Sequence, residues 1–201
     1  MKKLIALLLA LVMVLSLAAC GNKNGENNAE EPTTEVTEEV TEPEVPAPGS
    51  ALEVLETIWA LYDDSEKFPV MGGDANNIVD GAPGAFSLDD QEMLTFQLLV
   101  PADQAGNIDE AASLIHGMMV NNFTCGVFHV TGDADAFAEA MYNAVKNNQW
   151  MCGFPETMLI SVIGGEYVLM AFGINDAMNP LSEKLVEAYP AAEIVYNESV
   201  V

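Results

Sequence analysis

The stretch MLISVIGGEYVLMAF, residues 158–172, decides the fold. Two apolar runs flank Gly164-Gly165, and a Gly-Gly pair between such runs is typical of a two-residue β-hairpin turn. Pairing Ile163 with Glu166 across the turn leaves apolar side chains on both faces of the hairpin. One face then carries Met158, Ile160, Val162, Tyr167, Leu169 and Ala171. Such a hairpin is typical of a sheet that other parts of the same chain cover on both faces, or of a sheet with one apolar face exposed for a partner. We expect the first alternative, intramolecular cover.

A second hairpin is predicted upstream of this one. Residues 113–120 and 123–130 are apolar runs joined by Asn121-Asn122, a dipeptide that tolerates left-handed turns. In residues 133–149 the apolar side chains recur at helical spacing. Asp133 suits the start of this helix because its negative charge lies at the positive end of the helix dipole.

The end of the chain predicts one more helix and a strand. Asn179 is expected to cap a helix whose first residue is Pro180, since proline is tolerated in the first helical turn, and Pro190 ends it. Residues 193–196 predict a last short strand. From residue 111 onward the predicted order is therefore ββαββα, with this strand as an optional addition.

The segment before residue 111 is more varied. Residues 51–63 have the spacing of an amphipathic helix. Residues 68–85 are rich in glycine and proline and predict a loop. Residues 88–100 predict a helix with a capping-box start at Ser87, although residues 94–98 also alternate like a strand.

Together these segments predict the α+β class. The expected architecture is an antiparallel sheet of two hairpins with packed helices, preceded by an amphipathic N-terminal helix. Either the helix at residues 51–63 or the segment at 87–100 is expected to cover the second face of the sheet.

The beginning of the chain carries a lipid-anchor signal. Two lysines precede an apolar run, residues 4–17, whose length is typical of a signal-peptide core. The following Leu17-Ala18-Ala19-Cys20 resembles the lipobox of bacterial lipoproteins. This resemblance implies removal of residues 1–19 and attachment of fatty-acyl chains, such as palmitate, to Cys20 on the extracytoplasmic face of the cell membrane. The alternative is an ordinary secretory cut after Ala19.

Residues 20–50 form an acidic linker ahead of a single predicted domain. The linker holds eight glutamates against one lysine and no aromatic residue, so we expect a disordered, extended spacer. Residues 51–201 are long enough for one α+β domain with its own core. That domain has 23 acidic residues against three lysines and no arginine, a formal charge of −20. A nucleic-acid partner is not expected because nucleic-acid binding needs a positive surface.

Cysteine and histidine are the rarest candidate ligands in the domain. Cys125 and Cys152 are predicted at the same end of the strand–helix unit, where a disulfide and two free thiols are equally open alternatives. His116 and His129 are predicted near one another across the second hairpin. A metal site that adds Cys125 is one interpretation; hydrogen-bonded histidines at the sheet surface are the expected one.

The sequence shows no nucleophile elbow, phosphate-binding loop or zinc-ligand spacing, so no catalytic, cofactor or metal residue is predicted. Asp74, Asn76, Asn77 and Asp80 bring oxygen atoms close together as in a calcium loop. The EF-hand spacing is not met, however, because Val79 stands where the sharp turn needs glycine.

Methionine is frequent in the domain. Such a composition is found in copper sites and adaptable binding faces, but methionine that is spread over several elements usually fills the core, which we expect here. The residues are Met118, Met119, Met141, Met151, Met158, Met170 and Met178.

Several of these stretches occur in a recognisable succession: MMVNN at 118–122, CGVFH at 125–129, a helix over 133–148 and VIGGEYVLM at 162–170. The succession resembles an uncharacterised domain of clostridial and other Firmicute lipoproteins, and it covers about residues 87–190. This sequence departs from the family in Val120, which separates the methionine pair from the asparagine, and in its Gly-Gly turn. The family has no assigned activity, so the resemblance implies fold and location and transfers no site residue.

The function predicted from these features is a non-catalytic, lipid-anchored binding or interaction module of the cell envelope. Its ligand, a protein or a small apolar molecule, is expected at a sheet face or at the loop of residues 68–86. The alternatives are an extracytoplasmic enzyme that uses acidic side chains, or a calcium-binding surface domain. Paired buried carboxylates in a cleft would favour the enzyme, whereas an exposed apolar patch without titratable neighbours would favour binding.

Overall fold

The apolar hairpin of residues 158–172 forms the centre of the sheet in the computed structural model, which describes residues 47–200. Its strands are β6 (Thr157–Ile163) and β7 (Tyr167–Gly173). Gly164 and Gly165 both have left-handed φ angles, of 61° and 79°, which glycine adopts without strain. Glu166 is also part of the turn, so the turn has three residues and Ile163 pairs with Tyr167.

The predicted pairing of Ile163 with Glu166 is therefore wrong by one residue. A shift of one residue moves every side chain of the second strand to the opposite face. Leu159 shares its face with Leu169, and Ile160 shares the other face with Met170. The expectation that both faces of the hairpin are apolar is unaffected, because every residue from Met158 to Ile163 and from Tyr167 to Gly173 is buried.

The α+β class with an antiparallel sheet is confirmed, but the sheet is larger than two hairpins. Within residues 47–200 it contains eight strands in the order β2-β1-β4-β5-β7-β6-β8, with β3 paired to β4. The other six strands are β1 (Val70–Gly72), β2 (Val79–Asp80), β3 (Gly84–Ala85), β4 (Ile108–His116), β5 (Phe123–Val130) and β8 (Glu193–Ser199).

The connection between β4 and β5 is longer than the predicted two-residue turn. The last paired residues are Ile115 and Thr124, and the 3-10 helix η3 (Val120–Asn122) lies between the strands. Asn121 and Asn122 thus belong to a helical turn and do not form a two-residue hairpin turn. The physical reason is a distant contact: the Asn121 side chain donates hydrogen bonds to carbonyl groups of residues 151 and 153.

Residues 68–85, predicted as a loop, contain the short strands β1, β2 and β3. Their glycines explain why the segment looked irregular. Gly72 and Gly84 lie so close together that a Cβ atom on Gly72 would overlap the backbone of Gly84. The backbones can approach in this way only where no side chain intervenes.

Four helices occur in the described residues: α2 (Ala51–Ala60), α3 (Gln91–Leu98), α4 (Ala134–Asn147) and α5 (Asn175–Ala188). A polar side chain caps each of the first three. The Ser50 hydroxyl accepts a hydrogen bond from the Glu53 N–H, and Asp133 does the same for Ala136. Helix α3 is capped by Asp90, three residues later than the predicted start at Ser87.

Helix α5 begins at Asn175, so the prediction of a cap at Asn179 with Pro180 as the first residue is wrong. Pro180 lies in the second turn of the helix. The start is fixed by strand β6: the Glu156 carboxylate accepts the Asn175 N–H at 2.8 Å, and the Thr157 hydroxyl donates to the Asn175 side-chain oxygen. These contacts join residues about 18 positions apart, which a local pattern does not reveal.

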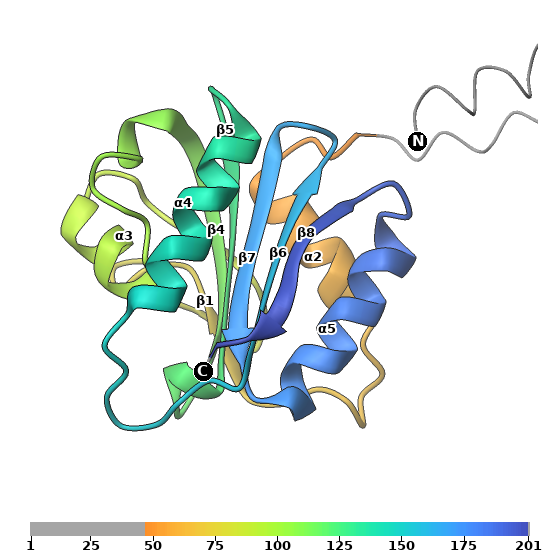
Figure 1. Ribbon diagram of the computed structural model, residues 1–201. Helices are drawn as coiled ribbons and strands as arrows, with labels where there is room; N and C mark the ends of the chain where they lie inside the picture. Colours follow the sequence, from red (N-terminus) through yellow and green to blue (C-terminus); the bar gives the residue numbers. More distant parts are fainter. Residues whose placement is uncertain (1–46, 201) are drawn as a thin grey trace, which may run out of the picture. The chain divides into compact units, whose positions relative to one another are not determined.

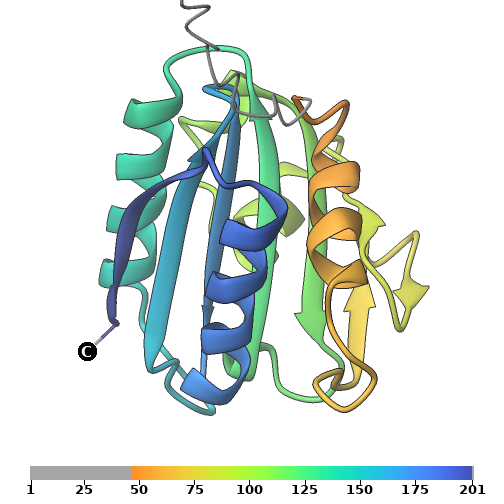
Figure 2. The same ribbon diagram turned by 90° about the vertical axis from the view of Figure 1, so that its right-hand side faces the viewer.

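The helices form one layer on each side of the sheet (Figure 1). Helices α2 and α5 pack side by side on one face, as Figure 2 shows from the front, and α3 and α4 pack on the other. Leu185 and Phe128 are completely buried in these two cores, and burial of such a side chain contributes about 2–3 kcal/mol. The expected intramolecular cover is confirmed for the central hairpin, whose two faces are not available to a partner.

Candidate functional site

An apolar pocket lies at one end of the sheet, where three connections meet. These are the β4–β5 connection, the α4–β6 connection and the end of helix α3. The first two run below the sheet in Figure 1. The pocket measures about 560 Å³, within the range of small-molecule sites. We name it the methionine pocket after its most exposed walls, which include Phe96, Met118, Met119, Val120, Met151 and Cys152.

The walls of the methionine pocket are unusually exposed for apolar residues. Phe96 is 82% exposed, Met118 80% and Met151 78%. Scattered exposed apolar residues are ordinary, but several around one concave site mark a binding surface. Within residues 47–200, none of the side chains that line this pocket belongs to aspartate, glutamate, histidine or lysine.

Polar contacts hold the two main connections in place. The Asn121 side-chain amide donates to the Met151 carbonyl at 2.8 Å and to the Gly153 carbonyl at 3.0 Å, which ties the two connections together. The Nδ1 atom of His116 accepts hydrogen bonds from the backbone N–H groups of Met118 and Met119, at 3.1 and 3.3 Å. These bonds hold the backbone in place and involve no methionine side chain.

The floor of the pocket belongs to the core. Trp150 packs edge-on against Phe172, with ring centroids 4.8 Å apart. Phe172 is buried at the end of β7, so this contact anchors the α4–β6 connection to the sheet. Leu99 ends helix α3 in a left-handed conformation and also lines the pocket.

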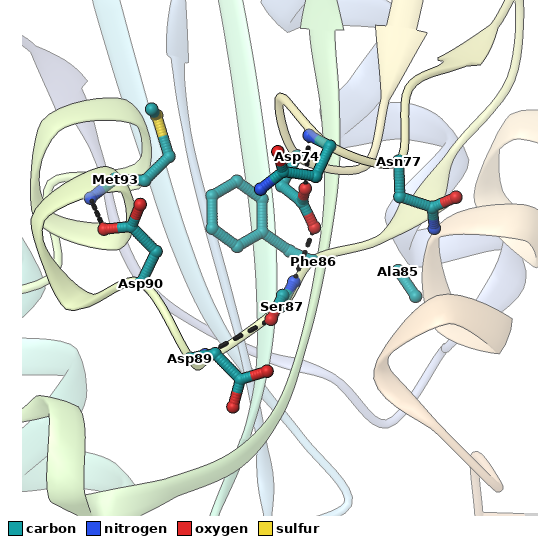
Figure 3. A pocket seen from close by; sticks show the side chains of 9 residues that line it. Asp74, Asn77, Ala85, Phe86, Ser87, Asp89, Asp90 and Met93 are labelled. Atoms are coloured by element: carbon teal, nitrogen blue, oxygen red, sulfur yellow. Dashed lines mark hydrogen bonds between the residues drawn. The ribbon is translucent and has the colours of Figure 1, made fainter.

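A second pocket, of about 450 Å³, is acidic (Figure 3). Asp74 is buried there, and its two carboxylate oxygens accept hydrogen bonds from the backbone N–H groups of Asn76 and Ser87, at 2.7 and 3.0 Å. These bonds, that from Ser87 first, lower the pKa of Asp74 below its ordinary value. Asp90 is occupied as the cap of α3.

The acidic pocket differs from the calcium loop that was considered as an alternative. Asp74, Asn76 and Asn77 line it as the sequence suggested, but Asp80 lies on strand β2 and is not among the lining residues. Within residues 47–200 no group of three or more histidine, cysteine, aspartate or glutamate side chains is arranged to hold a metal ion. The carboxylate of Asp74 closes the loop between β1 and α3, which is a structural role.

The two histidines are far apart along the β4–β5 hairpin. His116 ends β4 beside the methionine pocket, whereas His129 is near the other end of the hairpin, where it pairs with Glu110. The expectation that they lie near one another is wrong, because the register differs from that of a turn at residues 121–122: Ile115 pairs with Thr124, so the partner of His129 is Glu110. The Nδ1 atom of His129 lies 2.5 Å from the Asp109 carboxylate, and this hydrogen bond, aided by the charges of Glu110 and Glu166, raises the pKa of His129.

The alternative of a disulfide between Cys125 and Cys152 is not realised. Both are free thiols: Cys125 is buried within strand β5, and Cys152 is exposed on the α4–β6 connection. Burial raises the pKa of the Cys125 thiol, which keeps it neutral and inert. Cys152, by contrast, opens onto the methionine pocket.

Sequence reasoning missed the methionine pocket because its walls come from three separate segments. The expectation of methionine as core filler holds for Met141, Met158, Met170 and Met178, which are all buried. It is wrong for the three methionines of the pocket. The available signal was partial: Met151 and Cys152 lie in a predicted connection, where a core residue is out of place, whereas Met118 and Met119 end the apolar run of residues 113–120, which predicted a strand.

The lipobox at Cys20 and the acidic linker up to residue 46 lie outside the described residues. Among residues 47–200, no helix combines the length and the apolar character needed to cross a membrane. No family model, curated protein or solved structure matches the chain. The resemblance to the Firmicute lipoprotein domain therefore stays a prediction.

Proposed function

We propose that this protein is a non-catalytic binding module of the cell envelope, anchored to the extracytoplasmic face of the membrane by lipid on Cys20. Its ligand is a small apolar molecule that enters the methionine pocket. The anchor part of the proposal is supported by the signal-peptide pattern and by the sequence Leu17-Ala18-Ala19-Cys20.

One observation carries the binding part of the proposal. In a domain with a formal charge of −20, the described walls of the methionine pocket include no acidic or basic side chain, and Phe96, Met118 and Met151 expose most of their apolar surface there. Apolar surface left in contact with water costs about 25 cal/mol per Å². A ligand that covers these side chains recovers that free energy, and no charged side chain of the walls has to lose its hydration.

The enzyme alternative receives less support from the same structure. In the described residues the one buried carboxylate is that of Asp74, and its oxygens are occupied by backbone N–H groups. General acid–base catalysis needs a titratable group aimed at a site for the substrate. The pairing of His129 with Asp109 is exposed, and neither residue lines any of the pockets described above.

The binding part is tested with a neutral, environment-sensitive dye such as N-phenyl-1-naphthylamine. We expect the mature protein in detergent-free nanodiscs to enhance its fluorescence saturably above that of empty nanodiscs, and the double variant F96S/M151Q to lose that excess. The matched control is Ile78→Ser, which removes another exposed apolar side chain outside this pocket. Equal dye binding by F96S/M151Q and the parent protein would refute the proposal.

The anchor part is tested separately. Cys20→Ser is expected to abolish incorporation of labelled palmitate and to release the protein from the membrane fraction, because no thiol remains to be acylated. A Cys20→Ser protein that stays on the membrane and incorporates label would contradict it. Dye binding does not depend on this outcome.

A further inference from the structure

Four side chains that line the methionine pocket contain sulfur. Met118, Met119, Met151 and Cys152 all line it, so three thioethers and one thiol face the same cavity from two connections. Thioether and thiolate sulfur are soft ligands that favour Cu(I), whereas carboxylate and carbonyl oxygens favour hard cations. The composition of the walls is therefore that of a soft-metal site as well as of an apolar one.

The backbone contacts bring the sulfur-bearing residues together. Asn121 binds the carbonyl groups of Met151 and Gly153, which places the β4–β5 connection directly against residues 151–153. The end of the Met119 side chain reaches this second connection, because its Cε atom lies 3.8 Å from where a Cβ atom on Gly153 would be. Glycine at position 153 leaves that space open.

The exposure of these residues separates them from ordinary core methionines. Met118 and Met151 keep 80% and 78% of their surface in contact with solvent, and Cys152 is exposed as well. A thioether in that position gains little from packing, and an exposed thiol next to it is available as a ligand. Of the five exposed apolar side chains that wall the pocket, three are methionine.

The ligand types in the walls favour a soft cation over a hard one. The formal charge of −20 raises the concentration of cations near the domain. The walls themselves supply no carboxylate or imidazole within the described residues, so Ca²⁺ and Mg²⁺ lack the carboxylate ligands, and Zn²⁺ the imidazole ligands, that they commonly use. Cu(I) needs only sulfur.

We infer that the methionine pocket binds one Cu(I) ion through the sulfur atoms of Cys152 and of Met118, Met119 and Met151. Like the proposed function, this inference rests on a pocket that is open in solution, but it names a different ligand. On binding, the Cys152 thiol loses its proton to solvent and a sulfur–copper bond forms. Copper remains Cu(I), so no electron is transferred, and the affinity falls as the pH is lowered because protons compete for the sulfur.

The test is an anaerobic titration of the full mature protein with Cu(I) against a chromogenic Cu(I) chelator, repeated with Ag(I) as a second soft monovalent probe. We expect one ion per chain to be withdrawn from the chelator. The triple variant M118L/M119L/M151L and the single variant Cys152→Ser are both expected to lose this binding. The matched control, Met71→Leu, changes an exposed methionine on β1 and is expected to bind as the parent does.

The leucine variants separate this inference from the proposed function, because leucine keeps the walls apolar but removes the thioethers. Loss of Cu(I) with retention of dye binding in M118L/M119L/M151L supports the copper site. Unchanged Cu(I) binding in that variant, equal binding of Zn(II) by the parent, or no Cu(I) binding by a parent that still binds dye would each overturn it. A parent that binds neither dye nor Cu(I) refutes both proposals.

Discussion

The methionines of the core and those of the pocket are the same residue in two opposite situations. Met158 and Met170 in the central hairpin have no exposed surface, whereas Met118 and Met151 expose about four-fifths of theirs. The core methionines lie on covered strands or on the helices that cover them, and the pocket methionines lie on connections beyond the ends of the strands. Position relative to the sheet, and not residue type, therefore decides whether a methionine stabilises the fold or stays available to a ligand.

The two regions are also held together differently. Backbone ladders on both sides fix β7, which pairs with β5 and β6 along its whole length. The pocket is held by side chains: Asn121 binds one connection to the other, and His116 binds the turn at residues 118 and 119. Because these bonds lie outside the sheet, the pocket can change without loss of the core.

The largest expected effect contrasts one methionine from each region. Met170→Ala should lower the free energy of unfolding by about 2–5 kcal/mol, because it removes buried apolar surface and leaves a cavity. Met151→Ala should change it by no more than about 0.5 kcal/mol, since that side chain is exposed. Urea denaturation followed by tryptophan fluorescence measures both. Similar losses in the two variants would mean that the pocket is closed and packed in solution.

A smaller effect is expected in the acidic pocket, where Asp74 is bonded internally. Asp74→Asn should lower the free energy of unfolding by about 1–3 kcal/mol at pH 7, because one of the two backbone N–H groups loses its acceptor. The native pKa of Asp74 is lowered, so the carboxylate stabilises the fold above its unfolded pKa of 3.8, and this contribution is lost as the pH falls through the native pKa.

The difference between the parent and Asp74→Asn should therefore be complete at pH 7 and shrink below about pH 4. Urea denaturation at pH 7, 5 and 3.5 measures it. Asp89→Asn is the control, because Asp89 lines the same pocket and its side chain is exposed. A difference that is constant over this range would show that the charge of Asp74 does not matter.

The smallest effect is expected at Cys152, where the backbone of the pocket is left-handed. Cys152 has a φ angle of 61°, which costs a residue with a Cβ atom about 1 kcal/mol relative to glycine. Cys152→Gly relieves this strain and should raise the free energy of unfolding by up to about 1 kcal/mol. The gain can fall to zero, because glycine also has more freedom in the unfolded chain, which lowers the stability. Cys152→Ala, which keeps the left-handed strain, is the control. Destabilisation by Cys152→Gly alone would show that the connection adopts another conformation in solution.

Local patterns determined much of the fold. The apolar runs on either side of Gly164-Gly165 predicted the central hairpin, and Asp133 with the helical spacing after it predicted α4 nearly to the residue. In these segments the residues that decide the structure are neighbours in the chain. The same locality explains the failure at α5, where Glu156 and Thr157, at the start of β6, set the start of a helix that follows β7.

The candidate site depended on tertiary structure almost entirely. The sequence by itself determined an α+β domain with a double-sided apolar hairpin, a strongly acidic charge and, after the helix of residues 133–149, a connection that carries Met151 and Cys152. Only the fold decided that the hairpin turn has three residues, that His116 and His129 lie apart, and that the two connections meet through Asn121. The physical reason is that a pocket forms where chain segments distant in sequence come together, and no periodicity within one segment encodes that meeting.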